Sequence, residues 1–119
     1  MHPRLAELLR YDELQRESLL AAVETVPESL RDRRPSPALW SVAEILEHLG
    51  IVEQGIAHLI TRQIDRAQEG GFPRETETSS LLDSLDRFPL LDRSTHMPAP
   101  DFVRPPGKQN AATALETLT

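Results

Sequence analysis

The stretch from Trp40 to Leu49, WSVAEILEHL, decides the fold because it contains a complete signal for the start of a helix. Ser41 and Glu44 have the spacing of a capping box, in which the Ser hydroxyl accepts the Glu amide proton and the Glu carboxylate accepts the Ser amide proton. Trp40 precedes this cap and Ile45 follows it one turn inside the helix, which is the arrangement of a hydrophobic staple. The stretch therefore predicts that a helix begins at Ser41.

This predicted helix continues to Glu69, where Gly70 and Gly71 end it. Its apolar residues recur at the spacing of a helix that buries one face against a core. They are Val42, Ile45, Leu46, Leu49, Val52, Ile56, Leu59 and Ile60. The pattern predicts a long helix with a single apolar stripe.

Another long helix is predicted on the N-terminal side, from Arg4 to Val26, where Pro27 ends it. Charged residues separate its apolar positions, which again fit one buried face. These positions are Leu5, Leu8, Leu9, Leu19, Leu20, Val23 and Val26. The connector at 28–39 contains Pro35 and Pro37, so we expect no long helix there.

The sequence changes character after Gly71, because prolines interrupt the chain repeatedly as far as Lys108. In this long connection we expect one short helix at 78–88, carrying Leu81, Leu82 and Leu85, and otherwise irregular structure. A third helical pattern begins after Asn110, a residue that favours the N-cap position. Its apolar positions are Ala112, Leu115 and Leu118.

These elements predict an all-α fold. Aromatic residues make up only 4% of the chain, so its core must be aliphatic, which suits helices better than strands. Helices with one apolar stripe each are stable when about four of them pack into a bundle. We therefore expect an up-down four-helix bundle in a single domain, residues 1–119, with its two long helices antiparallel. The bundle is incomplete, as in a C-terminally truncated domain.

Composition excludes several classes of function. The chain has 13 basic and 19 acidic residues and a net charge of −6, whereas nucleic-acid binders concentrate basic residues to contact phosphates. It has no cysteine, which excludes disulfides and thiolate metal sites. No apolar run is long enough to cross a membrane, and no signal peptide is visible. We expect a cytoplasmic protein that binds neither nucleic acid nor membranes.

His48 is the candidate functional residue. On a helical wheel it lies beside Val52 and Leu59, at the edge of the predicted buried stripe. Neutral imidazole is a common ligand of zinc, nickel and iron, although one imidazole cannot hold a metal by itself. The alternative is a half-buried histidine that is hydrogen-bonded to a neighbouring backbone group or carboxylate. Helical position alone leaves both interpretations open.

The other titratable candidates are weaker. His2 lies at the start of the chain, where we expect fraying, and His58 lies on the opposite side of its helix from the stripe. His96 lies in the proline-rich connection. Glu44, one turn before His48, could orient the imidazole, but the capping box already accounts for this carboxylate. We therefore expect no complete set of metal ligands.

The stretch from Trp40 to Leu49 resembles the second-helix signature of the DinB-like superfamily, which has a Trp-Ser pair, a helical apolar stripe, and a His followed by Leu. Residues 2–9, 33–35 and 103–108 fit the same family, so the resemblance covers most of the chain. It implies a four-helix bundle that is often dimeric. Many members bind a divalent metal through one His on the second helix and a His-x-x-x-His pair on the last, and some are hydrolases or thiol transferases.

Carried over to this sequence, the resemblance makes His48 the first metal ligand, and the two ligands of the last helix have no counterpart. We therefore interpret the chain as the N-terminal portion of a DinB-like protein. The complete protein would use zinc, nickel or iron in a hydrolase or thiol or small-molecule transferase reaction, on a substrate that the sequence does not identify. The chain as it stands is expected to hold no metal and to be inactive. The alternative is a non-catalytic helical module that self-associates, as a homodimer, through exposed apolar stripes.

Overall fold

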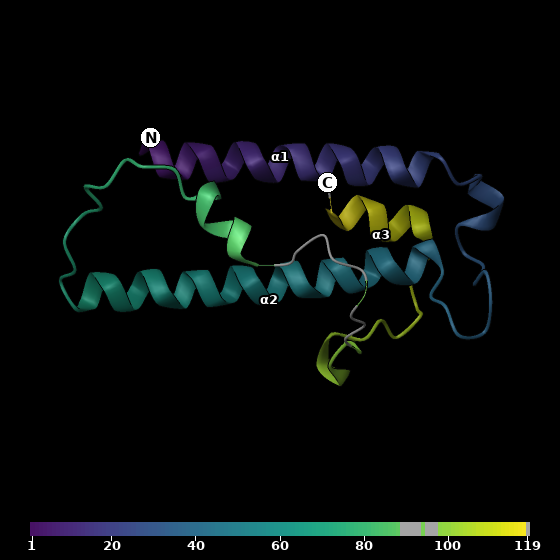
Figure 1. Cartoon of the computed structure of the whole chain (residues 1–119). Coiled ribbons are helices and arrows are strands. Elements are labelled where there is room, and N and C mark those ends of the chain that lie inside the picture. Colours follow the sequence, from purple (N-terminus) through teal and green to yellow (C-terminus); the bar gives the residue numbers. More distant parts are fainter. Residues whose placement is uncertain (89–93, 95–97, 119) are drawn as a thin grey trace. The chain divides into compact units, whose positions relative to one another are not determined.

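A computed structural model describes residues 1–88, 94 and 98–118 of the 119-residue chain. All regular elements in this part of the chain are helical, and it contains no strand. The elements are α1 (Pro3–Glu24), the 3₁₀ helices η1 (Glu28–Leu30), η2 (Leu82–Arg87) and η3 (Asp101–Val103), and the helices α2 (Val42–Glu69) and α3 (Ala111–Leu118) (Figure 1). The predicted all-α class is confirmed.

The chain divides into two compact units. The first comprises residues 1–25 and 73–98, and the second comprises residues 26–72 and 99–119. Because α1 belongs to the first unit and α2 to the second, their antiparallel packing in one domain stays a prediction.

The first long helix, α1, has bounds within two residues of those predicted. His2, where fraying was expected, is its N-cap: the Nδ1 atom accepts a hydrogen bond from the amide of Arg4 at 3.2 Å. Pro3 occupies the first helical position, where its missing amide proton costs nothing and its fixed φ angle suits a helix. Cap and proline together define the start of α1.

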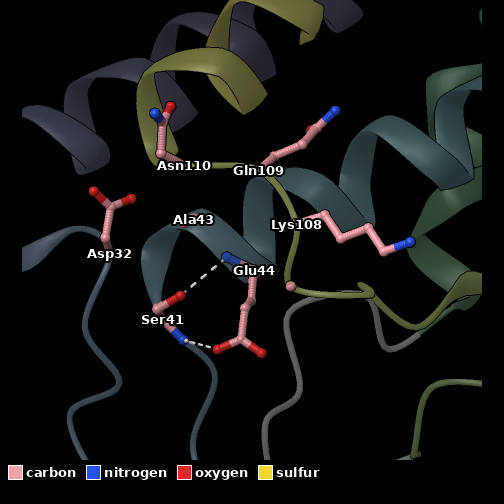
Figure 2. Close-up of a pocket in the computed structure, with 8 residues that line it drawn as sticks. Asp32, Ser41, Ala43, Glu44, Lys108, Gln109 and Asn110 are labelled. Carbon is pink, nitrogen blue, oxygen red and sulfur yellow. Dashed lines mark hydrogen bonds between the residues drawn. The ribbon is translucent and has the colours of Figure 1, made fainter.

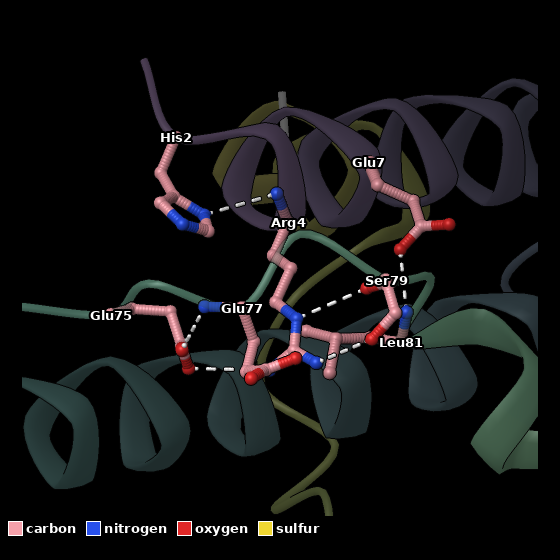
Figure 3. Close-up of polar contacts among 7 residues, drawn as sticks. All are labelled: His2, Arg4, Glu7, Glu75, Glu77, Ser79 and Leu81. Carbon is pink, nitrogen blue, oxygen red and sulfur yellow. Dashed lines mark hydrogen bonds and ion pairs between the residues drawn. The ribbon is translucent and has the colours of Figure 1, made fainter.

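The connection that follows Phe72 is tied to the start of α1 by side-chain hydrogen bonds (Figure 3). The Arg4 guanidinium donates to the carbonyl oxygen of Ser79 at 3.0 Å, to its hydroxyl at 2.9 Å and to Glu75 at 3.2 Å. Glu7 accepts the amide proton of Leu81 at 2.8 Å. The segment immediately before η2, which has no regular structure, is thus held to α1 by polar contacts.

The predicted short helix at 78–88 is present as η2, a 3₁₀ helix over Leu82–Arg87. The leucines of this segment are half-buried, as expected for its apolar face. Leu81 precedes η2, and Leu82 and Leu85 lie within it. The third predicted helix is also present, as α3.

The start of α2 agrees with the prediction in detail. The Ser41 hydroxyl accepts the amide proton of Glu44 at 3.1 Å, and the Glu44 carboxylate accepts the amide proton of Ser41 at 3.2 Å. The capping box therefore forms at the predicted residues and sets the first turn of α2.

The end of α2 is a Schellman motif. The amide of Phe72 donates to the carbonyl oxygen of Ala67 at 3.0 Å, and that of Gly71 donates to Gln68 at 3.2 Å. This geometry requires a left-handed residue after the helix, and Gly71 supplies it with φ of 66°. The predicted end at Glu69 is confirmed.

The core of the second unit lies where α3 packs against α2. Its fully buried apolar side chains are Ala43 and Leu46 on α2 and Ala111, Ala114 and Leu118 on α3. Asn110 caps α3 as predicted, since its Oδ1 atom accepts the amide proton of Thr113 at 2.8 Å. The predicted face of α3 was partly wrong, because Ala112 is exposed and Leu115 only half-buried. The buried face of α3 is formed instead by Ala111, Ala114 and Leu118.

The prediction of a continuous buried stripe along α2 was also wrong. The stripe is buried or half-buried in the first half of the helix, apart from Ile45, and exposed from Ile56 onward. No helix among the described residues is long and apolar enough to cross a membrane. The cytoplasmic location stays a prediction.

Candidate functional site

His48 lies in the first half of α2, is half-buried, and has a defined hydrogen-bond partner. Its Nδ1 atom is 2.6 Å from the carbonyl oxygen of Val103, the last residue of η3. A carbonyl oxygen can only accept a hydrogen bond, so Nδ1 carries the proton. In the neutral ring, Nε2 then presents its lone pair, which is the form of imidazole that binds a metal.

The ring of Trp40 is a further constraint on His48. The two ring centroids are 5.2 Å apart and the ring planes are tilted by 57°. This distance and tilt lie within the usual range for pairs of aromatic rings. Together with the Val103 carbonyl group, Trp40 restricts the rotation of the imidazole.

The loop after η3 is fastened to α2 at two adjacent residues. Glu47 is buried, with 6% of its surface accessible, and its Oε2 atom accepts the amide proton of Gly107 at 3.1 Å. His48, the next residue of α2, bonds to Val103 at the other end of the same short segment. Gly107 has φ of 73°, a conformation that favours glycine and turns its amide toward the carboxylate. This double attachment fixes the segment that orients His48.

The alternative offered for His48 from the sequence, a half-buried histidine hydrogen-bonded to a backbone group, is what the structure shows, but the sequence did not identify the residues that hold it. Val103 and Gly107 belong to the segment 103–108, which carried the family resemblance without any indication of what it touches. The hydrophobic staple assigned to Trp40 did not suggest its contact with His48. Helical periodicity contains no signal for these three contacts.

Glu44 is committed to structural bonds. Beyond its bond to Ser41, it accepts two hydrogen bonds from Arg34, from Nε at 2.7 Å and from Nη2 at 2.6 Å. The bonds from Arg34, above all, lower the pKa of Glu44 from 4.5 to about 2. Because the folded-state pKa is depressed, this carboxylate contributes stability above pH 4.5 that is lost as the pH falls toward about 2. The interpretation that Glu44 caps the helix is confirmed.

The other predicted candidates are found elsewhere or are not described. His58 is exposed on the second half of α2, His2 caps α1, and His96 lies outside the described residues. No group of three or more His, Asp or Glu residues that could hold a metal ion occurs within residues 1–88, 94 and 98–118. This part of the chain therefore supplies one oriented imidazole nitrogen and no complete ligand set.

A polar hollow of about 480 Å³ lies beside the start of α2 (Figure 2). Its polar lining residues are Asp32, Ser41, Glu44, Lys108, Gln109 and Asn110. Three of these side chains accept hydrogen bonds from backbone amides. Asp32 accepts the amide proton of Ala111 at 2.7 Å, and Ser41 and Glu44 form the capping box. Figure 2 shows the Lys108 side chain extending away from Asp32. The hollow is lined by residues at the start of α2 and by residues just before α3. His48 does not line it.

The fold and site define an all-helical protein with one oriented histidine on its longest helix. Residues 11–119 match the family model of the DinB superfamily. The chain therefore belongs to the DinB superfamily. No curated protein and no solved structure matches it significantly.

Proposed function

We propose that this DinB-superfamily protein binds a divalent metal ion and that His48 contributes one ligand through Nε2. The hydrogen bond from Nδ1 to the Val103 carbonyl oxygen carries the proposal. Metal-binding histidines almost always donate their other ring N–H to a carbonyl or carboxylate, which fixes both tautomer and orientation. His48 has this arrangement, and its Nε2 atom has no hydrogen-bond partner among the described residues.

The described residues fit such a metal only in part. A catalytic zinc site typically has about three protein ligands, and no group of three such ligands occurs among the described residues. The remaining ligands must therefore come from elsewhere than the described residues. Imidazole suits zinc, nickel and iron alike, so the metal is named only by that class. The proposal stops at metal binding, because hydrolase or thiol-transferase chemistry would require the complete ligand set.

The test is isothermal titration with zinc of the protein produced with any coding sequence that continues past Thr119. We expect stoichiometric binding that is lost in His48→Ala and retained in His58→Ala, the matched control on the exposed half of the same helix. The 119-residue chain alone is expected to bind zinc no better than its His48→Ala variant, because one imidazole does not make a site.

Equal zinc binding by wild type and His48→Ala in the longer protein would show that His48 is not a ligand. Tight binding by the 119-residue chain that disappears in His48→Ala would instead locate the other ligands within this chain or in a second copy of it.

A second candidate function, self-association without catalysis, is favoured by one surface. In the second half of α2, Ile56, Leu59, Ile60 and Ile64 are each about half exposed and follow helical spacing. A homodimer would cover this stripe. Light scattering should then show a dimer that Ile60→Asp converts to a monomer, while Thr61→Asp, which adds the same charge to the neighbouring exposed position, leaves it intact. A monomeric wild-type chain would contradict this function.

A further inference from the structure

An apolar hollow of about 510 Å³ opens beside Trp40 in the second unit, apart from the polar hollow of Figure 2. Its apolar lining side chains are Val26, Leu30, Pro35, Trp40, Val42 and Ile45. We refer to this space as the Trp40 hollow. Its size falls within the roughly 300–1,000 Å³ of small-molecule sites, which are mostly apolar with a few polar groups that fix orientation.

Two arginines line the Trp40 hollow, and they differ in what they bind. Arg34 is engaged, because it donates twice to Glu44 and once to the carbonyl oxygen of Pro37 at 3.2 Å. The Arg33 guanidinium makes no hydrogen bond or ion pair with any residue that the structure describes. The hollow therefore combines an apolar wall with one uncommitted cation.

We propose that the Trp40 hollow binds a small amphipathic carboxylate, with its apolar body against Trp40 and its carboxylate on Arg33. The planar guanidinium of arginine matches a carboxylate in charge and geometry, and such charge-assisted pairs are stronger than neutral hydrogen bonds. A cationic ligand would be repelled by both arginines. An uncharged apolar ligand would fill the space and leave the Arg33 guanidinium without a partner.

This site lies next to His48 without including it. The Trp40 ring lines the hollow and also lies beside the His48 ring, with 5.2 Å between the two ring centroids. The apolar body of the ligand would consequently be separated from the oriented imidazole by the Trp40 side chain. The inference does not depend on metal binding, because Trp40 is the side chain that the hollow shares with the surroundings of His48, and neither Trp40 nor Arg33 is a proposed metal ligand.

The experiment uses Trp40 as its own reporter, since it is the single tryptophan of the chain. The protein is titrated with octanoate, octanol and octylammonium, which share an apolar tail and differ in charge, while tryptophan fluorescence is recorded. We expect a saturable change with octanoate, weaker binding of octanol, and the weakest binding of octylammonium. Arg33→Gln should lower octanoate affinity by about tenfold, the loss expected for one charged hydrogen-bonded contact, and leave octanol affinity unchanged.

Matched variants keep the test specific. Arg62→Gln removes an exposed charge from the second half of α2 and should leave all three affinities unchanged. Arg33→Glu should reverse the preference, so that octylammonium binds more tightly than octanoate. Arg33 and Arg62 are both exposed, so substituting them does not disturb the core.

Four results would overturn the proposal. The first is equal affinity for octanoate and octanol, and the second is octanoate binding that does not respond to Arg33→Gln. The third is no saturable change with any of the three compounds. The fourth is a change in Trp40 fluorescence when the protein alone is concentrated, with no ligand added. That result would show that a second copy of the chain occupies the hollow.

Discussion

The two halves of α2 are built on one pattern but differ in how far their residues are buried. Most of residues 42–52 are buried or half-buried, and the buried ones are Ala43, Leu46, Glu47 and Gly50. In residues 53–69 every side chain is exposed except that of Ala67, which is half-buried. Both halves carry the same apolar periodicity. The periodicity of a helix therefore identifies its apolar face but does not say whether another element covers that face.

The difference extends to polar contacts. The first half is fixed by the capping box at Ser41, by the bond from Glu47 to Gly107, and by the bond from His48 to Val103. In the second half, Thr61 bonds back to the carbonyl oxygen of Ala57 within the same helix. Helical segments with few tertiary contacts open more readily than those packed in a core. His48 thus lies in the half that the structure holds more firmly, where a ligand position is best defined.

The largest expected effect comes from truncating the core of the first half. Leu46 is 1% accessible, so Leu46→Ala removes buried contacts and leaves a cavity beneath α3. We expect a loss of about 2–5 kcal/mol in the free energy of unfolding, the usual cost of such a truncation. Urea denaturation followed by far-ultraviolet circular dichroism and by Trp40 fluorescence would measure it.

Ile60→Ala is the matched control in the second half, where the side chain is 52% exposed. It should change the free energy of unfolding by no more than about 0.5 kcal/mol, as for most surface substitutions. A loss comparable to that of Leu46→Ala would mean that a partner covers the second half of α2 in solution, and that the two halves do not differ as described.

The elements predicted correctly from the sequence are those whose signals are local. Ser41 and Glu44 are three residues apart, and the capping box they form depends on no other part of the chain. The contacts that were missed join distant residues: His48 to Val103 spans 55 positions, Glu47 to Gly107 spans 60, and Asp32 to Ala111 spans 79. Such pairings depend on how loops return to the helix, which hydrophobic periodicity does not encode. His48 was consequently found as a candidate, while the group that orients it was not.

The last comparison concerns the two ends of α2. Ser41→Ala removes the hydroxyl that accepts the Glu44 amide proton, and we expect it to cost about 1 kcal/mol, as the loss of an N-cap usually does. Because this cap adjoins the α2–α3 core, the cost should appear as a lower urea midpoint of the whole transition. An unchanged midpoint would contradict the importance of the box.

Gly71→Ala is the corresponding change at the other end. It places an alanine at φ of 66°, in the left-handed region, which costs about 1–2 kcal/mol for a residue with a side chain. The last turns of α2 are exposed, so they can unwind locally and relieve this strain without unfolding the core. We therefore expect a smaller shift of the urea midpoint than for Ser41→Ala, together with faster hydrogen exchange at the amide of position 71 and at that of Phe72. An equal shift from both ends would show that α2 unfolds as one cooperative unit, because strain at its exposed end would then reach the core undiminished.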